Sequence, residues 1–392
     1  MTYNKKAQSL IFTVDQIMDS GLIFLFIAIG GNLLSGTEMA KVVVAQSIAL
    51  VCVLFCSCFT TQYLLLRYKN QTHSYWLKLF LFFVVITAAI IVVWFKSPLI
   101  LSLFVIGTVS EFFKRYCYYT DKSLISGCAM ISTATIFTVM MLLAWFKIIT
   151  FDSTSYVYFY CLAKFLPFLI VVPFFFKSKE KSKAHAVCND PFKHIIQDSL
   201  KLGGVFSIIT IIYWVTNQGF FILFKNEIPA NELVKLRITQ NVFGIVTMLI
   251  TLYDSIFLKS NINNDEKIFI WKKYFHFIFV AIGLIIVNYL ILYFLSITIY
   301  IHIDVFEYAF YLAMGQLFYL FSRMPILIMK LRYNLTLILI LYLVSLFISF
   351  AYLLLNKNNS DFQYIVESIA LANFLIFVFS LIIVSKKEKQ HG

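Results

Sequence analysis

The sequence predicts an all-α membrane protein that crosses the bilayer about twelve times, in two halves of six helices each. Hydrophobic residues make up 61% of its 392 residues and charged residues only 13%. A soluble chain of this length needs far more polar surface, so the composition excludes a soluble protein. Apolar segments of roughly 20 residues, the length of a membrane-spanning helix, follow one another along the chain.

The longest polar segment, residues 177–201, lies near the midpoint of the chain and is rich in lysine. Short loops rich in Lys and Arg face the cytoplasm, so this segment predicts a cytoplasmic middle. Six predicted spans precede it and six follow it, so both halves start on the same side, as a parallel duplication requires. We therefore expect an N-terminal lobe over 1–176, a basic cytoplasmic linker over 177–201 and a C-terminal lobe over 202–392.

The distribution of charge supports this order of spans. The predicted spans are 8–34, 40–66, 75–95, 98–119, 122–146, 154–176, 202–225, 231–258, 273–296, 303–324, 335–355 and 362–384. Most of the 32 Lys and Arg residues fall in the connections that this order assigns to the cytoplasm, including Lys114, Arg115 and Arg323. Both termini are therefore expected in the cytoplasm. No predicted outside connection exceeds about ten residues, which is short for an enzyme acting there.

The end of the linker has the pattern of a short amphipathic helix. Asn189 or Asp190 can cap it, Pro191 suits its first turn, and apolar residues from Phe192 to Leu200 recur at helical spacing. Such a helix would lie on the inner headgroups and tether the two halves. A disordered basic tether is the alternative.

Lys164 lies about ten residues from either end of the sixth span, too deep for its ammonium group to reach water easily. Two interpretations are open. Lys164 either forms an ion pair with a carboxylate on a neighbouring helix or lines a path for an anionic substrate.

The eighth span carries two cations and two amides. Lys235 is close enough to the outer end to reach water, whereas Arg237 is deeper. Gln240 and Asn241 follow Arg237 by three and four residues, so one helix face presents all three. Because guanidinium binds phosphate in a bidentate way and amides both donate and accept, this face suits phosphate or sugar hydroxyls.

Asp15 and Asp19 lie one helical turn apart near the inner end of the first span. Like charges at this spacing raise the pKa of one member, so the pair could bind a proton or a sodium ion. The alternative is that both carboxylates reach the inner interface or pair with Lys5, Lys6 or lysines of the linker. Asn217 and Gln218, midway along the seventh span, are expected to form interhelical hydrogen bonds or, as the second interpretation, to contact substrate.

No catalytic or metal-binding motif is present in the sequence. The histidines are scattered without metal-ligand spacing, and neither a glycine-rich phosphate loop nor a nucleophile elbow occurs. We therefore predict no catalytic residues, no metal and no cofactor. Because the basic residues follow the membrane loops rather than an aromatic-lined patch, we also expect membrane-lipid contacts and no nucleic-acid partner.

Two stretches resemble a known family. They are TVDQIMDSGLIFLFIAIGGNLLS (13–35) and WVTNQGFFILFKNEIPANELVKLRITQNVFGIVTMLITLYDSIFLKS (214–260). Together with the two six-span halves and the basic middle, they are similar to Wzx-type O-antigen flippases, in the polysaccharide-transporter branch of the multidrug/oligosaccharidyl-lipid/polysaccharide exporter superfamily. KNEIPANEL departs from the glycine-rich turn that many of these relatives carry.

The resemblance implies two lobes around a central cavity lined mainly by spans one, two, seven and eight. It also implies a flippase that moves an undecaprenyl-pyrophosphate-linked oligosaccharide across the bacterial inner membrane, with a polysaccharide polymerase and a chain-length regulator as further partners. Arg237, Lys164 and Lys235 would hold the pyrophosphate or an acidic sugar. Gln240, Asn241, Asn217 and Gln218 would meet hydroxyls. A polysaccharide polymerase or other membrane glycosyltransferase and a small-molecule exporter of the same superfamily are the alternatives.

Overall fold

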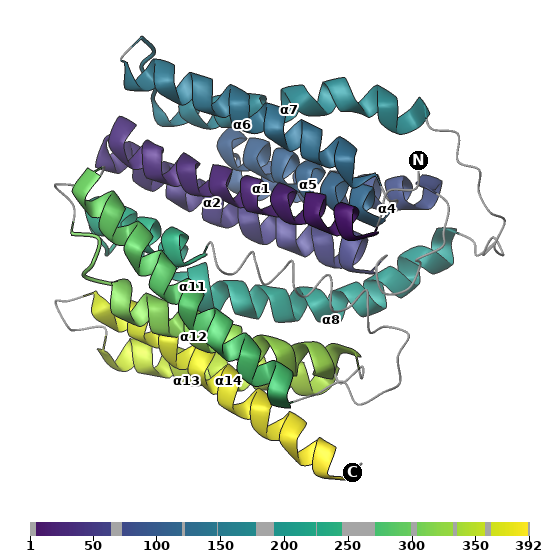
Figure 1. Cartoon of the computed structure of the whole chain (residues 1–392), viewed down its shortest axis with the longest axis vertical. Coiled ribbons are helices and arrows are strands. Elements are labelled where there is room, and N and C mark those ends of the chain that lie inside the picture. Colours follow the sequence, from purple (N-terminus) through teal and green to yellow (C-terminus); the bar gives the residue numbers. More distant parts are fainter. Residues whose placement is uncertain are drawn as a thin grey trace. The chain divides into compact units, whose positions relative to one another are not determined.

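The computed structural model describes residues 5–63, 73–119, 122–146, 148–177, 192–224, 226–244, 271–298, 304–331, 335–356 and 362–390. Every regular element within these ranges is a helix, as Figure 1 shows. The long helices are α1 (Lys5–Leu33), α2 (Gly36–Ser57), α4 (His73–Phe95), α5 (Pro98–Tyr119), α6 (Ser123–Trp145), α7 (Ser153–Lys177), α8 (Phe192–Gln218), α11 (Trp271–Thr298), α12 (Ala309–Leu331), α13 (Leu335–Asn356) and α14 (Gln363–Gln390). The short helices are η1 (Cys58–Gln62), a π-helical turn, and α9 (Phe220–Leu223), and residues 230–244 are also helical.

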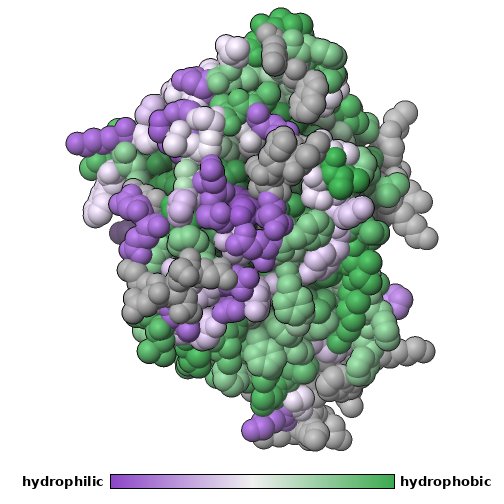
Figure 2. All heavy atoms as spheres, turned by 90° about the vertical axis from the view of Figure 1, so that its left-hand side faces the viewer, coloured by the Kyte–Doolittle hydropathy of each residue, from purple (hydrophilic) through white to green (hydrophobic). Residues whose placement is uncertain are grey.

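Nine of the helices in the described part of the chain are long and apolar enough to cross a membrane. Their surfaces fit this role, because large apolar side chains such as Trp94 on α4, Phe279 on α11 and Phe347 on α13 are exposed. Lipid is the solvent in which such surfaces are stable. Figure 2 shows hydrophilic side chains gathered on the face where helices end, with hydrophobic surface beside them.

Local capping explains where α7 begins. Asp152 precedes its first residue, and its Oδ1 accepts from the backbone N–H of Ser155 at 2.9 Å. Such a cap satisfies one of the N–H groups that a helix start leaves without an intrahelical partner. The bonds from Ser155 also lower the pKa of the exposed Asp152 carboxyl, because they favour its charged form.

The structure corrects the bounds of two predicted helices and the place of one lysine. α8 starts at Phe192, so the helix predicted at the end of the linker is continuous with the membrane span, and it ends at Gln218 rather than at residue 225. α12 covers Ala309–Leu331 instead of 303–324, so Arg323 is helical and not in a loop. Lys114, assigned to a cytoplasmic connection, is a buried residue of α5. Loop charge alone cannot distinguish a solvated cation from one that pairs inside a bundle.

The chain divides into two compact units whose boundaries fall inside helices. Unit 1 comprises Met1–Leu22 and Lys41–Ile211, and unit 2 comprises Ile23–Ala40 and Ile212–Gly392. As a result, α1, α2 and α8 each contribute to both units. The predicted linker residues 178–191 lie outside the described part of the chain.

In unit 1, the first half of α8 packs directly on η1. Ser199 Oγ donates to the backbone oxygen of Phe59 at 2.6 Å. A Cβ atom on Gly203 would lie 2.6 Å from Phe59 Cδ1 and 3.0 Å from Phe59 Cα. Only glycine therefore permits this approach of the two backbones.

In unit 2, α14 packs along α12 and α13, and α11 packs on α12. The approach of α12 to α14 is close at Gly315, where a Cβ atom would lie 3.3 Å from Ala370 Cα. Small residues at such crossings let membrane helices come together without a hydrophobic driving force. This packing fixes the position of Asn373, three residues beyond Ala370, inside unit 2.

Candidate functional site

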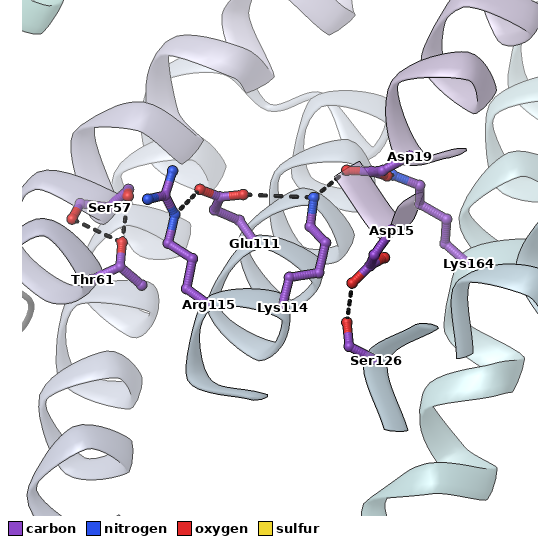
Figure 3. A network of polar contacts seen from close by, with 9 residues as sticks. All are labelled: Asp15, Asp19, Ser57, Thr61, Glu111, Lys114, Arg115, Ser126 and Lys164. Atoms are coloured by element: carbon purple, nitrogen blue, oxygen red, sulfur yellow. Dashed lines mark hydrogen bonds and ion pairs between the residues drawn. The ribbon is translucent and has the colours of Figure 1, made fainter. Parts of the chain in front are cut away.

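The charged cluster of unit 1 centres on a carboxylate between two lysines (Figure 3). Asp19 comes from α1, Lys114 from α5 and Lys164 from α7. Lys164 Nζ donates to Asp19 Oδ1 at 2.6 Å, and Lys114 Nζ donates to Oδ2 of the same carboxylate. All three residues are buried. Because each buried charge loses several kcal/mol of hydration, the mutual contacts are needed for the three to stay ionised inside the unit.

The cluster continues on α5, where Glu111 contacts both Lys114 and Arg115. Glu111 Oε2 lies 3.7 Å from Lys114 Nζ, and Arg115 Nε donates to Glu111 Oε1 at 2.5 Å. Residues three and four apart share a helix face, which explains why all three side chains of α5 meet. The ion-pair chain runs from Arg115 through Glu111, Lys114 and Asp19 to Lys164, as Figure 3 shows.

Asp15 is buried one turn before Asp19 and makes a different contact. Ser126 Oγ of α6 donates to Asp15 Oδ2. Within the described part of the chain, Asp15 Oδ1 is buried and has no hydrogen-bond partner. The two carboxylates that the sequence pairs as one ion site therefore differ: two lysines neutralise Asp19, whereas Asp15 keeps an oxygen that can accept.

In the structure Lys164 forms an ion pair with a carboxylate on a neighbouring helix, which is the first of its two interpretations. Its partner is Asp19, which the sequence interpretation had assigned to ion coupling. The ring of Tyr160, one turn earlier on α7, lies 5.2 Å from Lys164 Nζ, so the ammonium group also has a cation–π contact. Substrate contact by Lys164 stays a prediction, and it would require an anion to compete with a carboxylate already in place.

A polar cluster in unit 2 joins α8, the helix over 230–244 and α14. Arg237 Nη1 donates to Gln240 Oε1 at 2.9 Å, and Gln240 Nε2 donates to the backbone oxygen of Asn217 at 2.7 Å. Asn373 Nδ2 of α14 donates to Asn217 Oδ1 at 3.1 Å. All four residues are buried, and the Arg237 guanidinium lies 5.4 Å from the ring of Phe221. The structure thus brings together Arg237, Gln240 and Asn217 of the predicted substrate-binding residues.

The cluster lies where α8 stops. Asn217 and Gln218 are its last two residues, and Gly219 separates it from α9. Gly219 keeps helical φ and ψ angles of −60° and −28°, and its N–H donates to the backbone oxygens of Trp214 and Val215 at 3.1 Å, so the chain continues from α8 into α9. A Cβ atom on Gly219 would lie 2.7 Å from the backbone oxygen of Val215, so a larger residue does not fit at this position.

Lys235 and Asn241 have other partners within unit 2. Lys235 Nζ lies 2.9 Å from Glu232 Oε1 and 2.6 Å from Glu307 Oε2. The hydroxyl of Tyr308 donates to Glu232 Oε2 at 2.7 Å. Asn241 Nδ2 donates to the backbone oxygen of Phe24 at 3.4 Å, a long bond. Lys235 therefore belongs to an ion-pair group at the start of the helix over 230–244.

Sequence reasoning missed Lys114, Ser126 and Asn373. For Asn373 a signal existed, because it is a lone amide in the apolar stretch IALANFLIF, and polar residues at membrane depth need partners. Ser126 had none, since a serine can bond to its own helix backbone. In the described part of the chain, no group of three or more His, Cys, Asp or Glu side chains is placed to hold a metal ion.

The apolar helices and buried polar clusters define a multi-pass α-helical membrane protein. More particularly, the chain has the fold of multidrug resistance MATE family transporters of the MOP superfamily. It is similar to one such transporter in an outward-facing conformation, with a TM-score of 0.62, 12% identity, and coverage of 98% of this chain and 96% of the other. For the inward-facing conformation of a MATE transporter the TM-score is 0.54, at 13% identity with 98% and 96% covered.

A eukaryotic MATE transporter is also similar, with a TM-score of 0.56, 13% identity, and 97% and 95% of the two chains covered. No protein-family model matches the chain, and no curated protein matches it. At such low identities the structural similarity establishes the fold, and it confirms the all-α, polytopic class predicted from the sequence.

Proposed function

We propose that this protein is a flippase that moves an undecaprenyl-pyrophosphate-linked oligosaccharide across the bacterial inner membrane by alternating access. The transporter fold supports movement of a solute across the bilayer. The single observation that carries the substrate class is the buried Arg237 guanidinium within a cluster of amides. Guanidinium binds phosphate in a bidentate way, and amides bond to sugar hydroxyls.

The anion is assigned to Arg237 rather than to the lysines. Lys164 is bound by Asp19, and Lys235 by Glu232 and Glu307. An incoming phosphate would have to displace a carboxylate from either lysine. Arg237 Nη1 donates to the neutral amide oxygen of Gln240 at 2.9 Å, and a hydrogen bond from the guanidinium to a phosphate would be stronger than this one, because both of its partners are charged.

Flipping of a fluorescent polyprenyl-pyrophosphate sugar in proteoliposomes tests this function. Arg237→Gln should reduce the initial rate about 10- to 100-fold, because a charge-assisted hydrogen bond contributes about 1.5–3 kcal/mol. Lys193→Met, which removes an exposed lysine of α8, is the matched control and should flip at the wild-type rate. Wild-type flipping by Arg237→Gln would refute the assignment.

A small-molecule exporter is the second candidate, since the similar solved structures include multidrug resistance transporters. The same vesicles distinguish the two candidates. A flippase should move the lipid-linked sugar and leave an entrapped cationic dye in place, whereas an exporter should move the dye. Gradient coupling, if the flippase uses it, is assigned to Asp15, whose Oδ1 can take a proton or a cation.

A further inference from the structure

The hydrogen bonds of the polar cluster in unit 2 determine which way each amide side chain faces. Asn217 Nδ2 donates to the backbone oxygen of Tyr213 at 2.9 Å, so Asn217 Oδ1 must be the acceptor toward Asn373. A carbonyl oxygen can only accept, which makes this orientation unambiguous. Asn373 must therefore present its NH₂ group to Asn217, and its oxygen faces the other way.

The same reasoning applies to the arginine. Gln240 Nε2 donates to the backbone oxygen of Asn217, so Gln240 Oε1 accepts from Arg237. Two backbone carbonyls of α8 thus orient every amide in the chain of bonds from Asn373 to Arg237. Such a network holds the guanidinium and the Asn373 oxygen in one polar group built from three helices.

With the amides oriented in this way, acceptor oxygens at the cluster lack a donor within the described part of the chain. Among the described residues, Asn373 Oδ1 and Gln218 Oε1 are buried and have no hydrogen-bond partner. Asn373 is 1% exposed, so bulk water does not reach its oxygen in this conformation. A buried acceptor without a donor costs about 1–3 kcal/mol, and such groups in native proteins call for an explanation.

We propose that Asn373 Oδ1 is a specificity-determining acceptor for the donor groups, hydroxyl or amide N–H, of a phosphate-bearing substrate whose anion is bound by Arg237. This inference rests on the proposed function for the phosphate and extends it to α14, a helix that the sequence analysis does not place at the cavity. Gln218 Oε1, next to Asn217 on α8, is a second acceptor of the same kind. The positive charge of Arg237 in the same network disfavours a metal cation at these oxygens.

The test compares two probes on the purified full-length protein: farnesyl phosphate, and farnesyl phosphate linked to N-acetylglucosamine. The measured quantity is the ratio of their dissociation constants. The wild type should bind the glycosylated probe more tightly. Asn373→Leu should reduce that ratio about 5- to 10-fold and leave farnesyl phosphate binding within about 2-fold, as expected for the loss of one hydrogen bond.

Two further variants separate recognition from folding. Asn373→Ser keeps an oxygen that can donate to Asn217 and still accept, so it should retain part of the ratio. Asn288→Leu removes another buried membrane asparagine, on α11, and should leave the ratio unchanged. The inference would be overturned if Asn288→Leu lowered the ratio as much as Asn373→Leu does. It would also be overturned if Asn373→Leu weakened the binding of both probes equally.

The outcomes also separate this inference from the proposed function. If Arg237→Gln binds farnesyl phosphate normally but Asn373→Leu still lowers the ratio, the anion assignment fails and the acceptor role stands. If Arg237→Gln weakens the binding of both probes and Asn373→Leu changes the binding of neither, the anion assignment stands and the acceptor role fails. Failure of both probes to bind the wild type overturns both. A further outcome is that sodium ions alone stabilise the wild-type protein against unfolding and fail to stabilise Asn373→Leu. That result would identify the amide oxygens as a cation site and would overturn the inference.

Discussion

Lys164 Nζ on α7 donates to Asp19 Oδ1 on α1 over 2.6 Å, and both residues are buried. The bond joins helices that are far apart in the sequence and satisfies two charges at membrane depth. Asp19 meets Lys114 of α5 through its other oxygen. A single carboxylate therefore holds three helices of unit 1 together, which makes it the charge whose loss should matter most.

Removal of Asp19 should destabilise the protein more than removal of either lysine. Asp19→Asn leaves two buried ammonium groups without their shared counterion, and breaking a buried pair costs about 3–5 kcal/mol. Lys164→Met leaves Asp19 paired with Lys114, so we expect roughly half that loss or less. The melting temperatures of the purified variants in detergent check the order, with Lys193→Met, a change at an exposed residue, as control. Equal melting temperatures for Asp19→Asn and wild type would show that the ion pairs do not stabilise unit 1.

Two adjacent glycines of α8 should respond in opposite ways to alanine. In Gly203→Ala the new Cβ atom meets Phe59 of η1 at 2.6 Å, so the helices must separate, at about 1–3 kcal/mol. At Gly204 nothing lies within 4 Å, and alanine gains about 0.5–1 kcal/mol of helix propensity. Melting temperatures should fall for Gly203→Ala and rise for Gly204→Ala. A rise for both would mean that α8 does not pack on η1 in the membrane.

Apolar length predicted where many helices lie. The predicted span 98–119 coincides with α5, and 335–355 differs from α13 by one residue. A bilayer requires about 20 apolar residues, and few alternatives satisfy that requirement. Length alone did not reveal that α8 starts at Phe192, because an amphipathic segment before a span can either lie on the membrane or extend the same helix.

Membrane depth identified charges that need partners but not the partners themselves. It singled out Lys164, Asp19 and Arg237, all of which are buried. Which carboxylate meets Lys164 depends on how α1 and α7 pack, and the sequence contains no record of that contact. Lys114 was missed for the opposite reason: its position near the end of a span resembles that of a loop lysine.

The ion pairs of Lys235 should contribute little to stability. Lys235 contacts Glu232 and Glu307, but all three side chains are partly exposed, with 14%, 23% and 32% of their surfaces accessible. Solvent screens such pairs, so Lys235→Met should cost about 1 kcal/mol or less, several times less than Asp19→Asn. Melting temperatures in 0.1 M and 1 M salt check this, since the loss should shrink at high salt. A larger loss than that of Asp19→Asn would contradict the screening argument.

Replacing Asp15 should affect ion coupling without lowering the stability of the protein. Asp15→Asn removes a buried charge and keeps an oxygen that can accept from Ser126, so the melting temperature should stay the same or rise. If Asp15 binds the coupling ion, the same variant should lose gradient-driven accumulation of substrate in proteoliposomes and keep exchange between two loaded compartments, because exchange needs no driving ion.

Ser126→Ala is the matched control for Asp15→Asn, since it removes the hydrogen bond to Oδ2 and leaves the charge in place. It should shift the pH or sodium concentration for half-maximal accumulation without abolishing accumulation. Wild-type accumulation by Asp15→Asn would exclude Asp15 as the coupling residue. Asp19 would not replace it, because the ammonium groups of Lys114 and Lys164 already occupy both of its oxygens and a further cation would have to displace one of them.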